Sequence, residues 1–409
     1  MKELLKMFLP IIFLFGILII QSCNKPTSQD KSNSQEEAMT SKTQPRKGNG
    51  FYIDPNLKSL QEVDEFIAQC KRMRVNKIFV ETKNSNGELL YPSNKFPTAR
   101  HSGEFDCYGA ICSAAHRENI SVHAWFVIFH EGADNPVPII KEHPEYLIVN
   151  RDGKSNVEQP TWSTVDPKYS TYWVCPTAKG YRDYLKEMMQ DVIDRYNVDG
   201  IHLDYIRYPE EVDARQYCYC DRCNALFKEN YGYSLPANDV IKNRYWVTQM
   251  CDNVTNAVID FADFAHEHDK LISAYVFTDY TTGIEAIYQD WPWFSRYLDF
   301  IIPTSYEVSP FYIHKMAKRA KAVIDNNCML FPTVYSAPAV RRSADGGKRW
   351  YNGQPEDVVS VFNAWIEEDV DGVVFFTYGM MNNLNYLTEE QREKNIEKIA
   401  GKSREYFEK

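Results

Sequence analysis

Eight short runs rich in β-branched and aromatic residues recur along the chain, and most are separated by stretches with a helical pattern. Runs that alternate with helices in this way are typical of parallel strands joined by crossover helices. Eight such units predict an α/β fold of the (β/α)8 TIM-barrel class, with functional side chains at the carboxyl ends of the strands. The runs are Gly50–Ile53, Lys77–Thr82, Ser121–Val127, Gly200–Asp204, Leu271–Val276, Phe300–Ile302, Met329–Phe331 and Gly372–Phe376.

Two apolar stripes at helical spacing indicate crossover helices, because a helix outside a barrel must bury one face. Residues in excess of an eight-unit barrel fall mainly in long loops after the third and fourth strands. A doubly wound sheet is the alternative, but it needs a Gly-rich turn after the first strand. Asp54-Pro55-Asn56 offers none. The stripes are Leu185, Met188, Met189, Val192, Ile193 and Tyr196, and Trp246, Met250, Val254, Val258, Phe261 and Ala265.

The N-terminal residues have the pattern of a bacterial lipoprotein signal. A short basic region is followed by the apolar run Phe8–Ile20, which is too short to cross a bilayer comfortably as a helix. The run closes on Ile20-Gln21-Ser22-Cys23, which resembles a lipobox. We therefore expect lipid on Cys23 and a protein anchored to a membrane of the bacterial cell envelope, in the periplasm or facing the surface. An uncleaved anchor helix is the alternative.

These patterns divide the chain into three parts. Residues 1–22 are predicted to be the signal peptide, and residues 23–48 a flexible tether. The tether is rich in Ser, Gln, Lys and Thr and has no apolar face with which to offset its ordering entropy. Residues 49–409 are predicted to form a single barrel.

Composition narrows the class of ligand. The formal net charge is -10, which argues against nucleic acid as a partner, because binding its phosphates needs clustered Lys and Arg. Aromatic residues make up 14% of the chain. An acidic, aromatic-rich chain suits uncharged ligands with flat apolar faces, of which carbohydrate is the obvious case.

The fourth strand carries the firmest candidate for catalysis. Because side chains alternate along a strand, Ile201 and Leu203 face the helices, whereas His202 and Asp204 face the barrel interior. Asp204 is the last inward residue, so its carboxylate is expected at the mouth of the barrel. We interpret it as a nucleophile or transition-state stabiliser whose pKa is held low by Arg207. The alternative is an Asp paired with Arg207 to close the barrel.

Motifs spread over roughly residues 50–380 resemble the glycosyl-hydrolase-like family 10 barrels. The resemblance implies a polysaccharide-acting barrel, often found in bacterial lipoproteins. The sequence departs from the family pattern at Glu81, where an Arg usually follows Val, and at Glu307, where an aromatic commonly follows Tyr. The motifs are Asn197–Pro209, Glu88–Ser93, Val122–Trp125, His143–Leu147, Asn150–Lys154, Asp166–Pro167 and Pro303–Tyr306.

Glycoside hydrolysis needs a second carboxyl group, held protonated as the general acid. Three candidates stay open: Glu307 at the end of the sixth strand, which we rank first, Asp279 after the fifth, and Glu81 at the end of the second. Glu307 or Glu81 could instead bind substrate, and Asp279 could cap a loop. Further side chains predicted to bind sugar near the mouth are His123, Trp125, His202, Arg207, Tyr208, Tyr306 and Tyr378.

The chain holds ten cysteines, and Cys218, Cys220 and Cys223 lie within six residues just after the fourth strand. This spacing suits three thiolate ligands of a structural zinc ion, with a fourth from elsewhere, such as Cys251. Disulfides or free thiols that pin the loop are the alternative. Two-carboxylate chemistry itself requires no cofactor.

Together these features predict an exported, lipid-anchored glycoside hydrolase that cleaves a poly- or oligosaccharide. The competing hypothesis is a catalytically silent, carbohydrate-binding barrel lipoprotein. A metal-dependent hydrolase such as a deacetylase would need a set of His and Asp ligands at the strand ends, and the sequence shows no such cluster.

Overall fold

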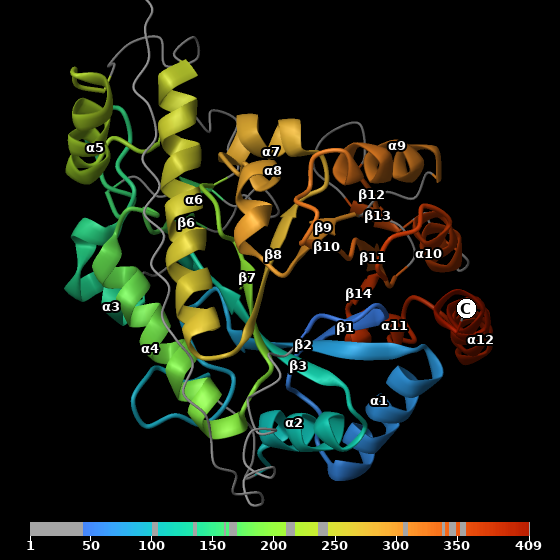
Figure 1. The fold of residues 1–409 in the computed structure, drawn as a ribbon. Coiled ribbons are helices and arrows are strands. Elements are labelled where there is room, and N and C mark those ends of the chain that lie inside the picture. Colours follow the sequence, from blue (N-terminus) through green and yellow to red (C-terminus); the bar gives the residue numbers. More distant parts are fainter. Residues whose placement is uncertain are drawn as a thin grey trace, which may run out of the picture. The chain divides into compact units, whose positions relative to one another are not determined.

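Nine parallel strands form the central sheet, which lies in the middle of Figure 1. Each strand pairs with its neighbour in parallel register in the order β10-β9-β8-β7-β3-β2-β1-β14-β11. The strands are β1 (Asn49–Ile53), β2 (Val75–Lys83), β3 (Ser121–Val127), β7 (Gly200–Asp204), β8 (Leu271–Phe277), β9 (Phe300–Thr304), β10 (Met329–Leu330), β11 (Thr333–Tyr335) and β14 (Val374–Phe376).

The computed structural model describes the chain from residue 44, in several stretches. The predicted signal peptide, Cys23 and most of the predicted tether lie outside the described residues, so those predictions stay predictions. Within the part that is described, no helix is both long and apolar enough to span a bilayer. The described stretches are 44–99, 105–133, 137–158, 161–162, 170–209, 217–235, 244–305, 310–337, 340–342, 349–351 and 357–408.

The seventh strand closes the sheet into a barrel. β10 pairs with β9 and β11 pairs with β14, and two residues separate β10 from β11. The N–H of Phe331 donates to Ile301 O over 3.0 Å, and the N–H of Val374 donates to Pro332 O over 3.0 Å. Proline has no N–H for the ladder, which accounts for the break in this strand. All eight predicted strand positions are therefore occupied, and the predicted (β/α)8 barrel is confirmed.

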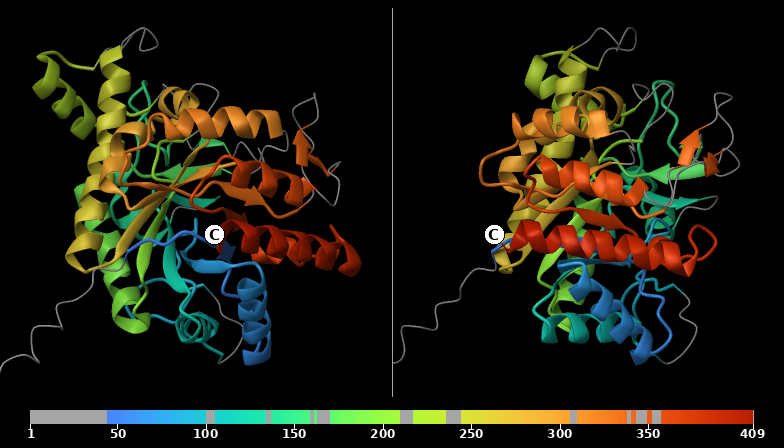
Figure 2. Two further views of the ribbon diagram at one scale, coloured as in Figure 1. Left: turned by 45° about the vertical axis from the view of Figure 1, so that its right-hand side comes forward. Right: turned by 90° about the vertical axis from the view of Figure 1, so that its right-hand side faces the viewer.

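Helices pack around the strands in all three ribbon views (Figures 1 and 2). The predicted stripes are the buried faces of α4 and α6, with Tyr196 half-buried at the end of the first. On one side α10 packs between α9 and α12 (Figure 2). The helices are α1 (Leu60–Arg72), α2 (Cys107–Arg117), α3 (Pro138–Glu142), α4 (Lys179–Tyr196), α5 (Asp221–Tyr231), α6 (Arg244–Glu267), α7 (Tyr280–Ile287), α8 (Trp291–Phe294), α9 (Pro310–Lys321), α10 (Asp357–Glu367), α11 (Tyr378–Met381) and α12 (Glu389–Phe407).

The long loops predicted after the third and fourth strands are present. The segment between β3 and α4 contains α3 and a small antiparallel sheet of β4 (His130–Ala133), β6 (Ser170–Trp173) and β5 (Thr161–Trp162). The segment between β7 and α6 contains α5. A two-stranded ribbon, β12 (Val340–Arg342) with β13 (Arg349–Tyr351), follows β11.

The barrel interior is filled largely by aromatic rings. Tyr52 packs against Phe79, Trp125 and Tyr275, with ring centroids between 4.9 and 5.4 Å apart. Gly200 is required by close packing, because a Cβ at this position would lie 2.3 Å from Nδ1 of His123. The interior is therefore a packed core, and the space for a ligand lies above it, at the ends of the strands.

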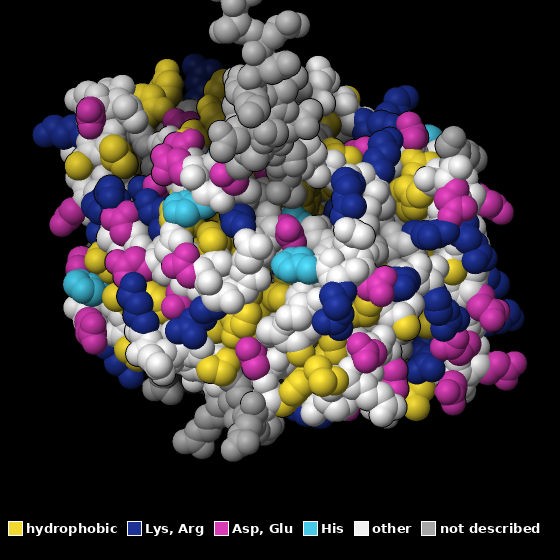
Figure 3. All heavy atoms as spheres, turned by 60° about the horizontal axis from the view of Figure 1, so that its bottom comes forward, with side chains coloured by type: hydrophobic (Ala, Val, Ile, Leu, Met, Phe, Trp, Pro, Cys, Tyr) yellow, Lys and Arg dark blue, Asp and Glu magenta, His cyan; other side chains and the backbone are white. Residues whose placement is uncertain are grey.

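Charged side chains of both signs cover the face of the molecule drawn in Figure 3. On the face shown in Figure 3, basic and acidic side chains are interspersed, and Lys and Arg do not gather into one continuous patch.

A buried ion pair fastens the small antiparallel sheet to the barrel. Nζ of Lys83, at the end of β2, lies 2.5 Å from Oε1 of Glu131 in β4, and both side chains are fully buried. Lys83 also donates to Val127 O over 2.7 Å, and the hydroxyl of Tyr181 donates to Glu131. These contacts join β2, β3, β4 and α4 just below the mouth.

Replacement of Glu131 by Ala is expected to lower the free energy of unfolding by about 3–5 kcal/mol, because it leaves the Lys83 ammonium buried without its counter-charge. Equilibrium urea denaturation measures this change. The matched control is Glu229→Ala on the exposed side of α5, which should change the same free energy by less than about 0.5 kcal/mol. Equal effects of the two substitutions would contradict the assigned role of the pair.

Candidate active site

Asp204 ends β7 and its carboxylate lies at the mouth of the barrel, as expected. The side chains of Ile201 and Leu203 belong to the core between strands and helices, so the predicted alternation along β7 is correct. Asp204 is 8% exposed. The indole Nε1 of Trp125 donates to its Oδ2 over 3.0 Å, and the backbone N–H of Tyr205 donates to its Oδ1 over 2.7 Å. The carboxylate is thus oriented by two donors.

Burial dominates the electrostatics of this carboxyl group. It raises the pKa of Asp204 to about 6, and the Trp125 and Tyr205 donors and the Arg207 charge oppose the rise only in part. The prediction that Arg207 holds this pKa low is therefore wrong. Arg207 lies near enough to act on Asp204 through its charge, yet its guanidinium packs over Tyr205 and Trp173, 4.7 and 5.3 Å from their ring centroids.

Glu81 is the last inward-facing residue of β2, and its side chain is half-buried. Desolvation raises its pKa to about 8, helped by the neighbouring Asp54 carboxyl, by a hydrogen bond with it and by the charge of Asp204. Asp54 follows β1 directly and is exposed, and its pKa is also raised. At neutral pH the pair therefore retains a proton on Glu81, which is the condition a general acid must meet.

The order of the strands explains why these groups meet. β7, β3, β2 and β1 are consecutive neighbours in the sheet, seen together in Figure 1. Glu81 is in register with Trp125, and the pairing of β2 with β3 is irregular just beyond it, between Glu81 and Lys83. Such an irregularity redirects side chains at a strand end. Asp54, Glu81 and Asp204 therefore stand along one arc of the rim, with Trp125 between the last two.

The turn after Asp204 is unusual. Tyr205 has φ of 50°, in the left-handed region that aromatic residues rarely adopt. Strained conformations of this kind concentrate at functional sites. Here the strain accompanies the hydrogen bond from Tyr205 N–H to the Asp204 carboxylate and places the half-buried Tyr205 ring beside Trp173.

Sequence reasoning missed two residues of this region, Asp54 and His130. Asp54 had the same signal as Asp204, a carboxylate directly after an inward-facing strand. His130, at the start of β4, lies 5.4 Å from the Tyr205 ring. Burial and the nearby Lys83 and Arg207 charges lower its pKa to about 3, so it is neutral, and its Nδ1 has no hydrogen-bond partner within the described stretches.

The other two candidates for the general acid are Asp279 and Glu307. Asp279 is the N-cap of α7, and its Oδ2 lies 2.7 Å from Nη1 of Arg319. Hydrogen bonds from Thr281 and the Arg319 charge outweigh its partial desolvation and lower its pKa, which favours the capping role over an acid role. Glu307 and its neighbour Tyr306 lie outside the described residues.

The two inward histidines are buried too deeply to meet a substrate. His202 is fully buried, with Nε2 2.7 Å from the Tyr52 hydroxyl and Nδ1 2.9 Å from the Ser273 hydroxyl. His123 is stacked on Phe79 below it. The prediction that these residues bind sugar is corrected: they belong to the packed interior, and burial lowers the pKa of both.

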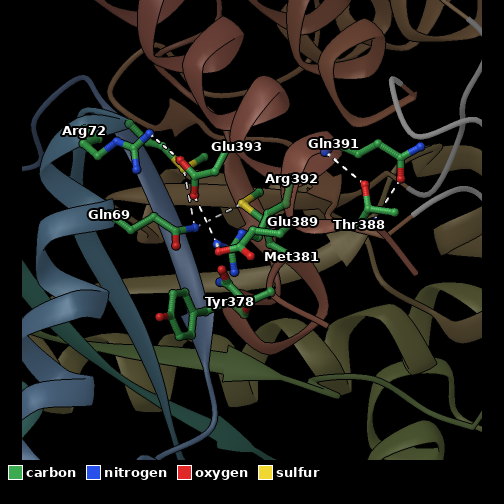
Figure 4. Close-up of polar contacts among 11 residues, drawn as sticks. Gln69, Arg72, Tyr378, Met381, Thr388, Glu389, Gln391, Arg392 and Glu393 are labelled. Atoms are coloured by element: carbon green, nitrogen blue, oxygen red, sulfur yellow. Dashed lines mark hydrogen bonds and ion pairs between the residues drawn. The ribbon is translucent and has the colours of Figure 1, made fainter. Parts of the chain in front are cut away.

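Two tyrosines predicted to line the mouth lie elsewhere. Tyr208 is buried, with its hydroxyl 3.1 Å from Nδ2 of Asn253. Tyr378 turns outward at the start of α11, where its ring packs on Phe51 and Phe66. Figure 4 shows it beside the contacts that join α1, α11 and α12. Neither residue supports the predicted sugar contact.

The three clustered cysteines do acquire a fourth partner, but it is Cys175 and not Cys251. The four sulfur atoms of Cys175, Cys218, Cys220 and Cys223, called the four-cysteine cluster below, all lie within 4.8 Å of one another and are buried. Cys251 is a separate buried thiol on α6.

Comparison with known sequences identifies the family of this chain. The sequence model of the family described as Glycosyl hydrolase-like 10 matches residues 50–331.

The chain belongs to this family.

Its relatives are distant. Glycosyl hydrolase YngK of Bacillus subtilis (strain 168) is 22% identical over 164 residues, which are 38% of this chain and 30% of that protein. Glycosyl hydrolase DigH of Escherichia coli (strain K12) is 23% identical over 162 residues, 38% of this chain and 36% of that protein. The matched region thus spans about a third of the length of each relative.

A solved structure shows the same fold. The crystal structure of a β-galactosidase from the psychrophilic Marinomonas ef1 superimposes with a TM-score of 0.61 at 13% identity, and the match covers 88% of this chain and 59% of that one. This likeness shows the fold of the chain.

The hydrogen bond from the Trp125 indole to Asp204 gives a direct test of the site in this member of the Glycosyl hydrolase-like 10 family. Trp125→Phe removes a donor to the Asp204 carboxylate, so the pKa of Asp204 should rise from about 6 by roughly 1–2 units, the worth of a hydrogen bond to a charged group. The pH dependence of the Asp204 carboxyl carbon signal in NMR spectra measures it. Trp173→Phe is the matched control, because this indole donates to Thr171; a similar shift in both variants would refute the assignment.

Proposed function

We propose that this protein is a glycoside hydrolase that cleaves a poly- or oligosaccharide with Asp204 and Glu81 as its two carboxyl groups. The proposal rests on the position of the two carboxyl groups: Glu81 is in register with Trp125, and the Trp125 indole donates to Asp204. Burial at this rim raises the pKa of Asp204 to about 6 and that of Glu81 to about 8. Between these values Asp204 is largely ionised and Glu81 largely protonated. Glycoside hydrolysis requires one carboxyl group in each of these states.

Each group then has a definite task. Glu81 donates its proton to the glycosidic oxygen as the bond to the leaving sugar breaks. The Asp204 carboxylate faces the anomeric carbon, where it stabilises the positive charge that develops or forms a bond to that carbon. Asp54 is a positioning residue: its hydrogen bond and charge keep the proton on Glu81 until substrate arrives.

The mouth offers surfaces that suit sugar rings. Half-buried aromatic side chains stand at the ends of three other strands: Phe277 ends β8, Tyr335 ends β11 and Phe376 ends β14. The Phe376 ring lies 6.1 Å from that of Trp125. Tyr335 and Phe376 are stacked, with ring centroids 6.4 Å apart. Flat apolar rings pack on the faces of pyranoses.

Turnover of a glycan panel tests the proposal. We expect Asp204→Asn and Glu81→Gln each to lower kcat/KM by about 10²–10⁴-fold, the usual worth of a positioned acid or base. In the wild type kcat/KM should rise as Asp204 ionises near pH 6 and fall as Glu81 deprotonates near pH 8. Glu81→Gln should lose the alkaline limb and recover turnover on aryl glycosides, whose leaving groups need no proton.

Asp279→Asn is the matched control for these variants. It removes a carboxylate at another strand end that is held by Arg319, so kcat/KM should change by less than about threefold. Equal turnover by wild type and Asp204→Asn would refute the assignment. Glycan binding without any turnover would instead support a silent carbohydrate-binding barrel.

We also propose that the protein is exported and held at a membrane of the cell envelope by lipid on Cys23. The lipobox-like Ile20–Cys23 segment and the polar stretch behind it support this proposal. A tether of roughly 25 residues would give the barrel a reach of about 25–30 Å from the membrane.

Metabolic labelling with a fatty-acid analogue tests the anchor. We expect label on the wild-type protein in the membrane fraction, and none on Cys23→Ser, which should accumulate as the uncleaved precursor. Ser22→Ala is the control within the same segment and should still be labelled. Labelled Cys23→Ser protein would show that lipid, if present, is attached elsewhere.

A further inference from the structure

The four-cysteine cluster has the dimensions of a metal site. A tetrahedral zinc ion with Zn–S bonds of about 2.3 Å places its ligand sulfurs about 3.8 Å apart. The Cys175 sulfur lies 3.5 Å from that of Cys223 and 3.8 Å from that of Cys220. A disulfide needs about 2.05 Å between its sulfurs, and all four cysteines are unpaired in the structure.

The surroundings suit a metal bound by four thiolates, which carries a net charge of about −2. The Arg222 guanidinium interacts electrostatically with all four sulfurs. Val149 N–H donates to the Cys218 sulfur over 3.4 Å, and the Asn253 side chain donates to the Cys223 sulfur over 3.5 Å. Hydrogen-bond donors around the sulfurs orient such ligands and spread their charge.

We propose that the four-cysteine cluster binds one zinc ion that joins the two long loops of the mouth. Four soft sulfur ligands in a tetrahedral arrangement select zinc over the harder divalent cations. With four protein ligands and full burial the site is closed, so the metal is structural and has no position for a substrate or a water. On binding, four Zn–S bonds form and the thiols lose their protons to solvent.

The position of the site indicates what the metal does. Cys175 follows β6 in the loop after the third strand, whereas the other three belong to the loop after the fourth strand and to α5. These inserted loops lie outside the eight-unit core, and a metal is a common substitute for a core in such segments. Tyr208, four residues after Asp204, contacts the sulfurs of Cys175 and Cys223 at 3.8 and 3.9 Å. The site therefore anchors the segment that carries Tyr205 and Arg207.

Metal analysis of the full-length protein, purified in detergent without chelators, tests the proposal. We expect about one zinc ion per chain, with a shell of four sulfurs in X-ray absorption spectra. Cobalt exchanged into the site should give sulfur-to-cobalt charge-transfer bands and the d–d bands of a tetrahedral centre. These readouts use the wild-type chain and do not depend on whether a variant folds.

Substitutions identify the ligands. Cys175→Ser and Cys220→Ser each remove a ligand and should lower the zinc affinity at least about tenfold, the smallest loss typical even when only a partner of a ligand is changed. After dialysis against a competing chelator, both variants should therefore retain less zinc than the wild type. Cys251→Ser, the matched control, should keep the full content because this buried thiol lies outside the cluster. Full zinc content in Cys175→Ser, iron in place of zinc, or disulfides within the cluster of the metal-free wild type would each overturn the proposal.

Discussion

Parallel pairing of the strands is the constraint on which the candidate site depends. Because every strand of the barrel runs in the same direction, each carboxyl end reaches the same rim. Register then decides which inward side chains are neighbours: Glu81 lies opposite Trp125 on β3, and Trp125 reaches Asp204 on β7. The arrangement of the carboxyl groups is thus set by backbone hydrogen bonds, and the long loops add walls around a site whose centre the barrel has already placed.

Ionisation of the buried Asp204 carboxyl group lowers the stability of the folded protein. The pKa of Asp204 is raised from 3.8 to about 6, so its ionised form is less stable in the folded than in the unfolded chain. The protein accordingly loses stability as pH rises from about 4 through 6, by about 3 kcal/mol for this group. The Trp125 indole, which packs on the aromatic interior, and the Tyr205 N–H hold the carboxylate in this unfavourable environment.

The sequence was sufficient to predict the eight strand positions of the barrel and which side chains of those strands face inward, because both follow from local periodicity. It located Asp204 and Glu81 at strand ends for the same reason. The depth of a side chain below the rim was harder to predict. His202 faces inward as expected, but the register of its strand buries it beneath the rim. Tyr378 shows a second limit, since the strand alternation ends at β14 and the chain turns outward into α11.

Contacts between segments that are distant in the sequence could not be predicted from local sequence patterns. The spacing of Cys218, Cys220 and Cys223 predicts three ligands, but no pattern around Cys175 marks it as their partner, because a loop from another strand brings it there. Asp54 was a different case. Its carboxylate directly follows an inward-facing strand, as that of Asp204 does, but Asp54 was considered only as part of the turn after the first strand.

The pairing of β1 with β14 also governs when the barrel can form. Gly50 is in register with Val374, so the first strand finds one of its two partners near the end of the chain. During synthesis that edge of β1 remains without a ladder until the ribosome has made almost the whole protein. Pairings of such long sequence separation are slow to form. The barrel can therefore close only late, after the segment that contains β14 has been made.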